Sequence, residues 1–388
     1  MGRKRSTRRT KGEGSYWFDK KNNRHVWYLE YEGRRHTVTD RDKDMAERKF
    51  QALRKQILSG VNIDGSKQLL SEWLPYYIDN EVARYRKRAT AHDYTKRADY
   101  FILPTLGEYR LCDLTRHICL AWVNAVVDYR SVKGKPWSLT SIKQARNLLN
   151  RALDAAVAER YLEYNPMSSV KVPDRRIGDE LVIEDKGPQQ KAFTPEQQEA
   201  FLEEVLRTND RHGFYAYYLL AAELGWRRGE GLGIRLKDVD FDQLTISINQ
   251  QVIRLDSEKL VTTPKTLSSQ RALPITQDLA AVLQEQCKRV GATGPDDLLF
   301  PNKQGQPRQP NGVTQHVRRV CKRLGFEGFN LHSLRKTAIT NWRRNGVDLE
   351  VAGALAGHKG VKVTAEVYSD PQMDRKRAAI EKKGKATE

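Results

Sequence analysis

The sequence has no hydrophobic run long enough to cross a membrane. Its longest uninterrupted apolar stretch, residues 214–222, has nine residues, whereas a membrane-spanning helix needs about 20. The N-terminal segment is basic and no apolar stretch follows it, so we expect no secretory signal. These absences argue against an integral membrane protein and favour a cytoplasmic location.

Cysteine is scarce, and no metal-binding pattern accompanies it. The chain has four cysteines, no Cys-x-x-Cys pair and no histidines clustered near them. A zinc site or a disulfide framework is therefore not expected, and a reducing interior fits best. No dense group of acidic residues suggests two-metal chemistry either. We expect no metal and no cofactor.

Acidic residues are fewer than basic residues in this chain. Lys and Arg number 68 against 49 Asp and Glu, which gives a formal net charge of +19. Such an excess favours a polyanionic partner, with nucleic acid ahead of an anionic membrane because no long basic amphipathic helix stands beside an apolar face. A protein that is simply basic is the alternative.

The first segment, residues 1–62, combines basic charge with short aromatic strands. Its first 60 residues hold 17 basic and 8 acidic residues. We expect strands at 15–18, 26–31 and 35–39 and a helix at 42–58 closed by Gly60. Such a sheet could lie in a DNA groove, although we predict that Trp17 and Trp27 belong to the core. The basic arm supplies further DNA-binding candidates: Arg3, Lys4, Arg5, Arg8 and Arg9.

The second segment, residues 66–172, predicts a helical bundle. Apolar residues recur at helical spacing over 69–78 and 140–158, and Asn165-Pro166 ends the last helix. The polar faces are rich in basic residues. The DNA-binding candidates among them are Arg84, Arg86, Lys87 and Arg88.

Residues 173–190 contain two prolines, two glycines and mixed charge, which is typical of a linker.

The third segment, 191–388, opens on a capping box at Thr194 with proline at the first helical position. Helices are expected to about 206 and at 213–224, and strands at 244–249, 259–261 and 271–275. Helices then dominate. The chain is predicted to be mainly α with small β-sheets, and its third segment to be a mixed α+β domain with a C-terminal tail.

Six residues of the third segment are suited to phosphate chemistry. Taken singly, each residue type has an ordinary structural interpretation. An exposed arginine is usually a surface charge, a histidine near a helix end usually caps the helix, and a tyrosine usually packs against its neighbours. His332 and Arg335 stand at i, i+3, so one helix would present both on one face. The complete ordered set is Arg227, Lys265, His332, Arg335, His358 and Tyr368.

That ordered set resembles the tyrosine recombinase family, of the phage-integrase type. Residues 223–240 match its Gly-x-Arg-x-x-Glu segment, and residues 263–275 its lysine-bearing hairpin. His332-Ser-Leu-Arg335 matches its His-x-x-Arg, and Leu355-Ala-Gly-His358 precedes the tyrosine as in the family. The resemblance covers about residues 192–372. The chain departs from the common pattern at Leu224, Ser333 and Lys336.

The resemblance implies a role for each residue. Arg227 and Arg335 would clamp the phosphate oxygens with planar, permanently charged forks. Tyr368 would attack phosphorus and form a 3′-phosphotyrosyl bond, and a neutral His332 would help to activate it. Lys265 would protonate the departing 5′-oxygen, His358 would hydrogen-bond the phosphate, and Glu230 would orient its basic neighbours. The intermediate conserves the bond energy, so no ATP is needed.

The implied function is a site-specific recombinase that integrates and excises a phage genome or mobile element in a bacterial host cell. Its partners would be double-stranded DNA at core and arm attachment sites, three further copies in a homotetramer, and accessory DNA-bending or directionality factors. The bundle would bind the core site, and residues 1–62 the arm site. The alternatives are a chromosome-dimer resolvase, a type IB topoisomerase-like enzyme and a non-catalytic DNA-binding regulator.

Overall fold

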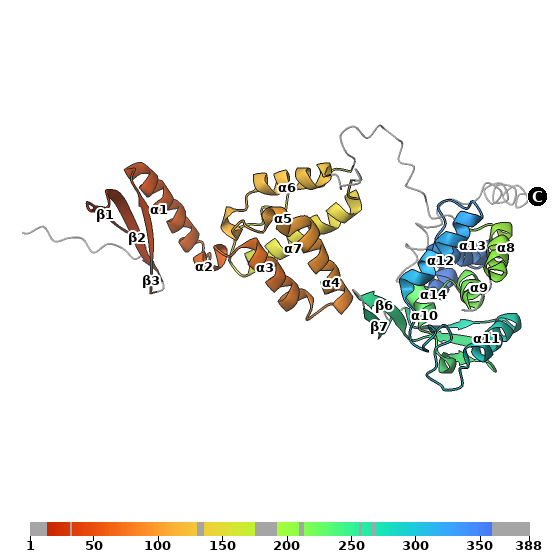
Figure 1. Cartoon of the computed structure of the whole chain (residues 1–388). Coiled ribbons are helices and arrows are strands. Elements are labelled where there is room, and N and C mark those ends of the chain that lie inside the picture. The colour runs from red at the N-terminus through yellow and green to blue at the C-terminus, as the bar shows by residue number, and fades with distance from the viewer. Residues whose placement is uncertain are drawn as a thin grey trace, which may run out of the picture. The chain divides into compact units, whose positions relative to one another are not determined.

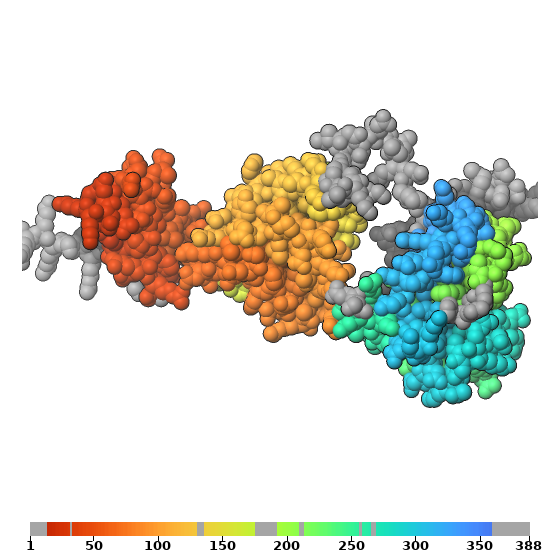
Figure 2. Space-filling view, in the orientation of Figure 1, coloured from red at the N-terminus to blue at the C-terminus, as the bar shows by residue number. Residues whose placement is uncertain are grey.

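The computed structural model describes residues 14–31, 33–129, 136–174, 192–208, 213–255, 258–264 and 269–358. The chain divides into two compact units, Met1–Leu181 and Val182–Glu388. Figure 1 shows their helices and strands, and Figure 2 shows the same residues as filled surfaces. The described residues form many helices and three small antiparallel sheets, so the prediction of a mainly α chain is confirmed. None of the described helices is both long and apolar enough to span a membrane.

The first unit begins with an antiparallel sheet of three strands in the order β1 (Ser15–Asp19), β2 (Arg24–Tyr31) and β3 (Arg34–Asp40). Helix α1 (Lys43–Leu58) follows, and its N-terminus is capped by the side chain of Asp42. Its buried residues include Phe50, on which Trp27 of β2 stacks with 5.0 Å between ring centroids. The three strands and the helix therefore form within two residues of the ranges predicted from the short aromatic strands and from Gly60.

No helix of the described residues covers the other face of this sheet, which we call its open face. Trp17 lies opposite Val26 in the register, so it points away from Trp27 and from α1. Its side chain is 40% exposed and packs edge-on against Tyr28. Arg35 lies 3.6 Å above the ring of Tyr28. The prediction that Trp17 belongs to the core is wrong, because the side-chain period of two puts it on the open face, whereas Trp27 does pack against the core.

The rest of the first unit is a helical bundle. Its elements are α2 (Ile63–Ser66), α3 (Leu70–Tyr77), η1 (Ile78–Val82), α4 (Arg88–Arg97), η2 (Ala98–Ile102), α5 (Leu103–Leu106), η3 (Leu111–Asp113), α6 (Arg116–Asp128) and α7 (Leu139–Ala158). Helix α7 supplies a buried stripe of seven residues at helical spacing, as its sequence predicts. The indole of Trp73 donates to the carbonyl of Ala152 at 2.8 Å and ties α3 to α7.

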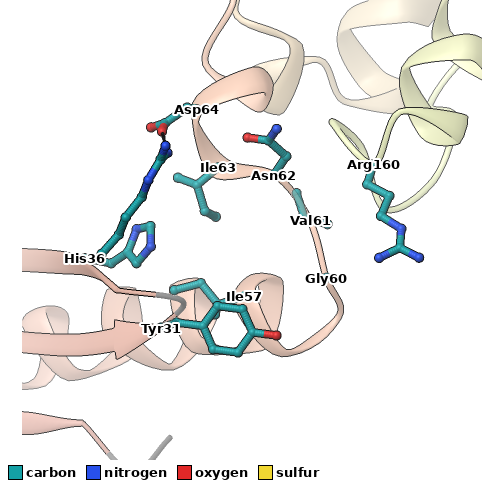
Figure 3. A pocket seen from close by; sticks show the side chains of 10 residues that line it. Tyr31, His36, Ile57, Gly60, Val61, Asn62, Ile63, Asp64 and Arg160 are labelled. Atoms are coloured by element: carbon teal, nitrogen blue, oxygen red, sulfur yellow. Dashed lines mark hydrogen bonds and ion pairs between the residues drawn. The ribbon is translucent and has the colours of Figure 1, made fainter.

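A cavity of about 460 Å³ opens beside the connection between α1 and α2 (Figure 3). An ion pair of 2.6 Å between Arg34 and Asp64 borders it, with both side chains exposed. The backbone N–H of Asn62 donates to the carbonyl of Arg160 at 2.7 Å. This hydrogen bond attaches the connection to the residues that follow α7.

The second unit holds two small sheets among helices. Its helices are α8 (Pro195–Arg207), α9 (Phe214–Leu224), α10 (Arg228–Leu232), η4 (Leu236–Asp238), α11 (Gln277–Val290), α12 (Pro310–Arg323), α13 (Leu331–Arg344) and α14 (Leu349–Ala356). Its strands are β4 (Val239–Asp240), β5 (Thr245–Ile248), β6 (Gln251–Leu255), β7 (Glu258–Thr262) and β8 (Arg271–Pro274). Strands β4, β5 and β8 form one sheet, and β6 and β7 pair in the other.

The core of the second unit lies around α9, where Tyr217 and Tyr218 are fully buried. The capping box predicted at Thr194 is present: its hydroxyl accepts from the N–H of Gln197, and the Gln197 side chain accepts from the N–H of Thr194. Just before it, the N–H of Phe193 donates to the hydroxyl of Thr337 on α13. This hydrogen bond attaches the segment that leads into α8 to helix α13.

Candidate active site

Arg227 occupies the turn between α9 and α10. Helix α9 ends at Gly225, whose φ of 61° belongs to the left-handed region that glycine tolerates. Arg227 then has an extended backbone and caps α10, and its N–H donates to Glu230 Oε2 at 2.8 Å. Its guanidinium donates to the other oxygen of Glu230 at 2.7 Å. The three-residue spacing thus lets one carboxylate fix both the backbone and the side chain of Arg227.

Glu230 is shared between two arginines. Its side chain is 1% exposed, and Arg271 of β8 also donates to it, at 3.1 Å. Burial opposes ionisation of this carboxyl, but the charges of Arg271 and Arg227 outweigh burial and hold its pKa below the usual value. Glu230 is therefore a buried carboxylate that orients both guanidinium groups.

Helix α13 contributes His332 and Arg335. Asn330 caps this helix by accepting from the N–H of His332 at 2.8 Å. Arg335 lies one turn further and is 3% exposed. Its guanidinium donates to the carbonyl of Gly225, at the end of α9, and to that of Ala356, at the end of α14, both at 2.6 Å. A buried cation thus satisfies helix-end carbonyls that have no partner within their own helices.

The end of α14 is held by three arginines, Arg227, Arg271 and Arg335, which we call the arginine cluster. They donate to three successive carbonyls: Arg271 to Leu355 at 2.6 Å, Arg335 to Ala356 at 2.6 Å and Arg227 to Gly357 at 2.8 Å. His358 is the next residue. The cluster therefore fixes the position of the chain at the point where it leads toward Tyr368.

Both histidines are held in the neutral form. Burial, with Arg335, Arg227 and His332 nearby, lowers the pKa of His358 to about 4. Burial and the charges of Arg335 and Arg227 also lower the pKa of His332, which stays accessible at the surface. A neutral imidazole can accept a proton or a hydrogen bond at pH 7.

A cleft of about 420 Å³ adjoins the arginine cluster. Among the described residues its lining has no acidic side chain and consists of Trp226, Arg227, Arg228, Thr314, Arg318, Asn330, Leu331, His332 and Arg335. Four guanidinium groups line this one cleft. Their planar forks suit an anion with two hydrogen-bond-accepting oxygens, such as a phosphodiester. Within the described residues, no group of three or more His, Cys, Asp or Glu side chains could hold a metal ion.

The structure brings together five residues that the sequence singles out: Arg227, Glu230, His332, Arg335 and His358. Lys265, Tyr368 and the arm residues Arg3, Lys4, Arg5, Arg8 and Arg9 lie outside the described residues. In the first unit, Arg84, Arg86 and Lys87 are exposed between η1 and α4, and Arg88 is exposed as the first residue of α4.

Arg271, Arg228 and Arg318 belong to this region, but sequence reasoning did not select them. Arg271 stands within the hairpin motif, and nothing in its local pattern shows that it is buried against Glu230. Ser333 departs from the family pattern, yet its hydroxyl accepts from the N–H of Asn330 and so supports the cap of α13. Lys336 is half-buried, and burial lowers its pKa.

Comparison with known proteins places this geometry in a family. The family model described as the phage integrase family matches residues 191–375. A XerC-like tyrosine recombinase of Caldanaerobacter subterraneus is 23% identical over 87% of this chain and 88% of its own length. The transposase of transposon Tn916 from Enterococcus faecalis is 23% identical over 89% of this chain and 84% of its own length.

Solved structures share the fold. The integrase of transposon Tn1549, in complex with transposon right end DNA, matches 81% of this chain and 99% of its own, with a TM-score of 0.65 and 19% identity. A lambda integrase tetramer bound to a Holliday junction matches 93% of this chain and 96% of its own, with a TM-score of 0.60 and 18% identity. Residues 191–375 therefore match the phage integrase family, and the chain is a tyrosine recombinase.

Proposed function

We propose that this recombinase cuts and rejoins DNA at specific sites through a 3′-phosphotyrosyl intermediate, and that it integrates and excises a phage genome or another mobile element. One observation supports the chemistry above all. The arginine cluster holds the end of α14 by three successive carbonyls, ten residues before Tyr368. The groups that bind phosphate therefore also fix the start of the segment that carries the nucleophile.

In the proposed reaction the phenolic oxygen of Tyr368 forms a bond to phosphorus, and the bond from phosphorus to the 5′-oxygen breaks. His332 accepts the phenolic proton, and Lys265 protonates the departing oxygen. Arg227 and Arg335 stabilise the added negative charge on the phosphate oxygens, and His358 donates to one of them. The reverse attack by the 5′-hydroxyl of another strand completes the exchange. Atoms and charge balance without a nucleotide cofactor or a metal.

The arrangement of the chain suits two kinds of DNA site. We assign residues 66–172 and 191–388 to the core site, with 173–190 as their linker, and residues 1–62 to the arm site. Arg84, Arg86, Lys87 and Arg88 are exposed together and would bind backbone phosphates of the core site. Within residues 1–62, the open face of the sheet carries Trp17, Tyr28 and Arg35, and this face would enter a DNA groove.

A homotetramer on DNA follows from the chemistry, since two duplexes present four strands to cut. The tetrameric lambda integrase structure supports this assembly. Accessory DNA-bending or directionality factors would join the complex at the arm sites. The protein would work in the cytoplasm of a bacterial host, associated with DNA.

The test is recombination by the purified full chain on a supercoiled plasmid that carries the joined ends of the element and its target site. We expect strand exchange between the two sites, in the presence of EDTA. Relaxation of the plasmid without exchange would instead indicate a topoisomerase-like enzyme. Binding without cleavage would indicate a regulator.

A further inference from the structure

The cleft beside the arginine cluster contains more positive charge than one phosphate needs. The proposed reaction uses Arg227 and Arg335 at the scissile phosphate. Arg228 and Arg318 line the same cleft and are exposed. Within the part of the chain that the structure describes, neither of these two guanidinium groups forms an ion pair, and their charges stay available to an anion.

Arg227 and Arg228 are neighbours in the chain, but their side chains diverge. Arg227 reaches Glu230 and the carbonyl of Gly357, at the catalytic side. Arg228 reaches α12 instead, where its guanidinium donates to the hydroxyl of Thr314 at 3.0 Å and contacts the side-chain oxygen of Asn311 at 3.4 Å. Two consecutive residues thus supply one arginine that contacts the end of α14 and another that contacts α12, and both line the cleft.

Helix α12 presents Arg318 to the same space. Thr314 and Arg318 stand at i, i+4, so they share one face of the helix. The opposite face is buried in the core through Val313, Val317 and Val320. Arg228, Thr314 and Arg318 therefore line the part of the cleft that borders α12.

We propose that Arg228 and Arg318 bind the phosphate next to the scissile one on the cleaved strand, and so set the register of the DNA in the site. The inference rests on the proposed function. Each strand of a duplex carries one phosphate per 3.4 Å of axis, so the phosphate next to the scissile one lies close to it and can reach further guanidinium groups of the same cleft. Planar guanidinium forks suit phosphate oxygens. These residues position the DNA and take no proton.

The test uses nicked suicide duplexes of the crossover site, with a neutral methylphosphonate in place of each of the two phosphates that flank the scissile one. The variants are Arg228→Gln and Arg318→Gln. The matched control is Arg319→Gln, an exposed arginine of α12 that does not line the cleft. On unmodified DNA we expect each cleft variant to form the covalent complex roughly tenfold more slowly, and the control to match the unaltered protein.

On one of the two methylphosphonate duplexes, the unaltered protein and the cleft variants should react at the same rate, because the contact has already been removed. Each variant should also lower the log–log salt slope of binding by about 0.9. The Arg228 variant should fold, since it is the backbone carbonyl of Arg228 that accepts from Tyr217 in the core.

A defect that stays undiminished on both methylphosphonate duplexes would overturn the proposal, as would an equal defect in the Arg319 control. If Arg228→Gln lowers the melting temperature enough to explain its slower formation of the covalent complex, then Arg228 only anchors α12 and the proposal fails for this residue. If the unaltered protein forms no covalent complex on unmodified DNA, then the proposed function itself fails, and this inference fails with it.

Discussion

The guanidinium of Arg335 donates to the carbonyl of Ala356 at 2.6 Å, and this bond joins α13 to the last turn of α14. The same guanidinium donates to Gly225 at the end of α9. Arg335 therefore connects three segments that are far apart in the sequence, at the position where the scissile phosphate would lie. Its proposed catalytic role and its structural role use the same charged group.

Arg335→Ala should lose both roles. We expect the cleavage rate to fall by roughly 2.7–4 kcal/mol of barrier if Arg335 acts like one oxyanion donor. Stability should fall as well, because two buried carbonyls lose their partner at about 1–3 kcal/mol each. Arg335→Lys keeps the charge and should recover part of the stability but little of the rate. Single-turnover cleavage and thermal unfolding measure the two effects, and a Lys variant with full activity would contradict the bidentate role.

Arg271 and Glu230 should behave as a coupled pair. Arg271→Met leaves a buried carboxylate with one arginine fewer, and we expect a loss of about 3–5 kcal/mol in the free energy of unfolding. Adding Glu230→Gln to that variant should lower the free energy of unfolding by less than the same substitution does in the original chain. A double-mutant cycle by urea unfolding measures the coupling, with the exposed Arg319→Met as a control. Strict additivity would show that the ion pair contributes nothing.

His358 should make stability depend on pH. Its pKa is about 4 in the folded chain against an ordinary value of 6.5, so between these values only the unfolded chain takes up the proton. The contribution of His358 to the free energy of unfolding is therefore fully present above pH 6.5. It is lost as the pH falls from 6.5 toward 4, because protonation then favours the unfolded chain. The groups that face His358 are Arg335, Arg227, His332 and Arg271. His358→Gln should show a flatter profile over this interval, and an unchanged profile would contradict the assignment.

Removal of residues 1–62 should separate the two proposed DNA sites. We expect cleavage at the core site to remain and binding to arm DNA to be lost. The salt dependence on long DNA should become shallower by about 0.9 in the log–log slope for each phosphate contact removed. Trp17→Ala in the full chain is a milder test, since it alters only the open face of the sheet. Identical footprints of the full and the shortened chain would leave residues 1–62 as a solubility arm or a protein-docking surface.

Local patterns predicted most of the elements. The stripe of α7, the capping box of α8 and the strands of the first sheet each depend on a period or a cap within a few residues. Two strands of the second unit lie outside the predicted ranges: β4 has only two residues, too few for a period, and β6 follows closely after the strand predicted at 244–249. Trp17 was misplaced because alternation tells which residues share a face but not which face a helix will cover.

The site was predictable as a set of residue types but not as a set of contacts. The motifs selected Arg227, His332, Arg335 and His358 because their spacing resembles a family. The carbonyls of residues 355–357 carry no signal in the sequence, and they meet the arginine cluster only after folding. Arg271 acquires its part in the site through the pairing of β8 with β5, which places it across from Ile248.

The most direct test of the account is trapping of a covalent complex on a nicked suicide duplex of the crossover site. The full chain should become linked to the 3′-phosphate at the cut, and the peptide that carries the link should contain Tyr368. Tyr368→Phe should bind the same DNA with near-normal affinity and form no covalent complex. A covalent complex that persists in Tyr368→Phe, or cleavage that requires a divalent metal ion and leaves no protein attached, would contradict the account.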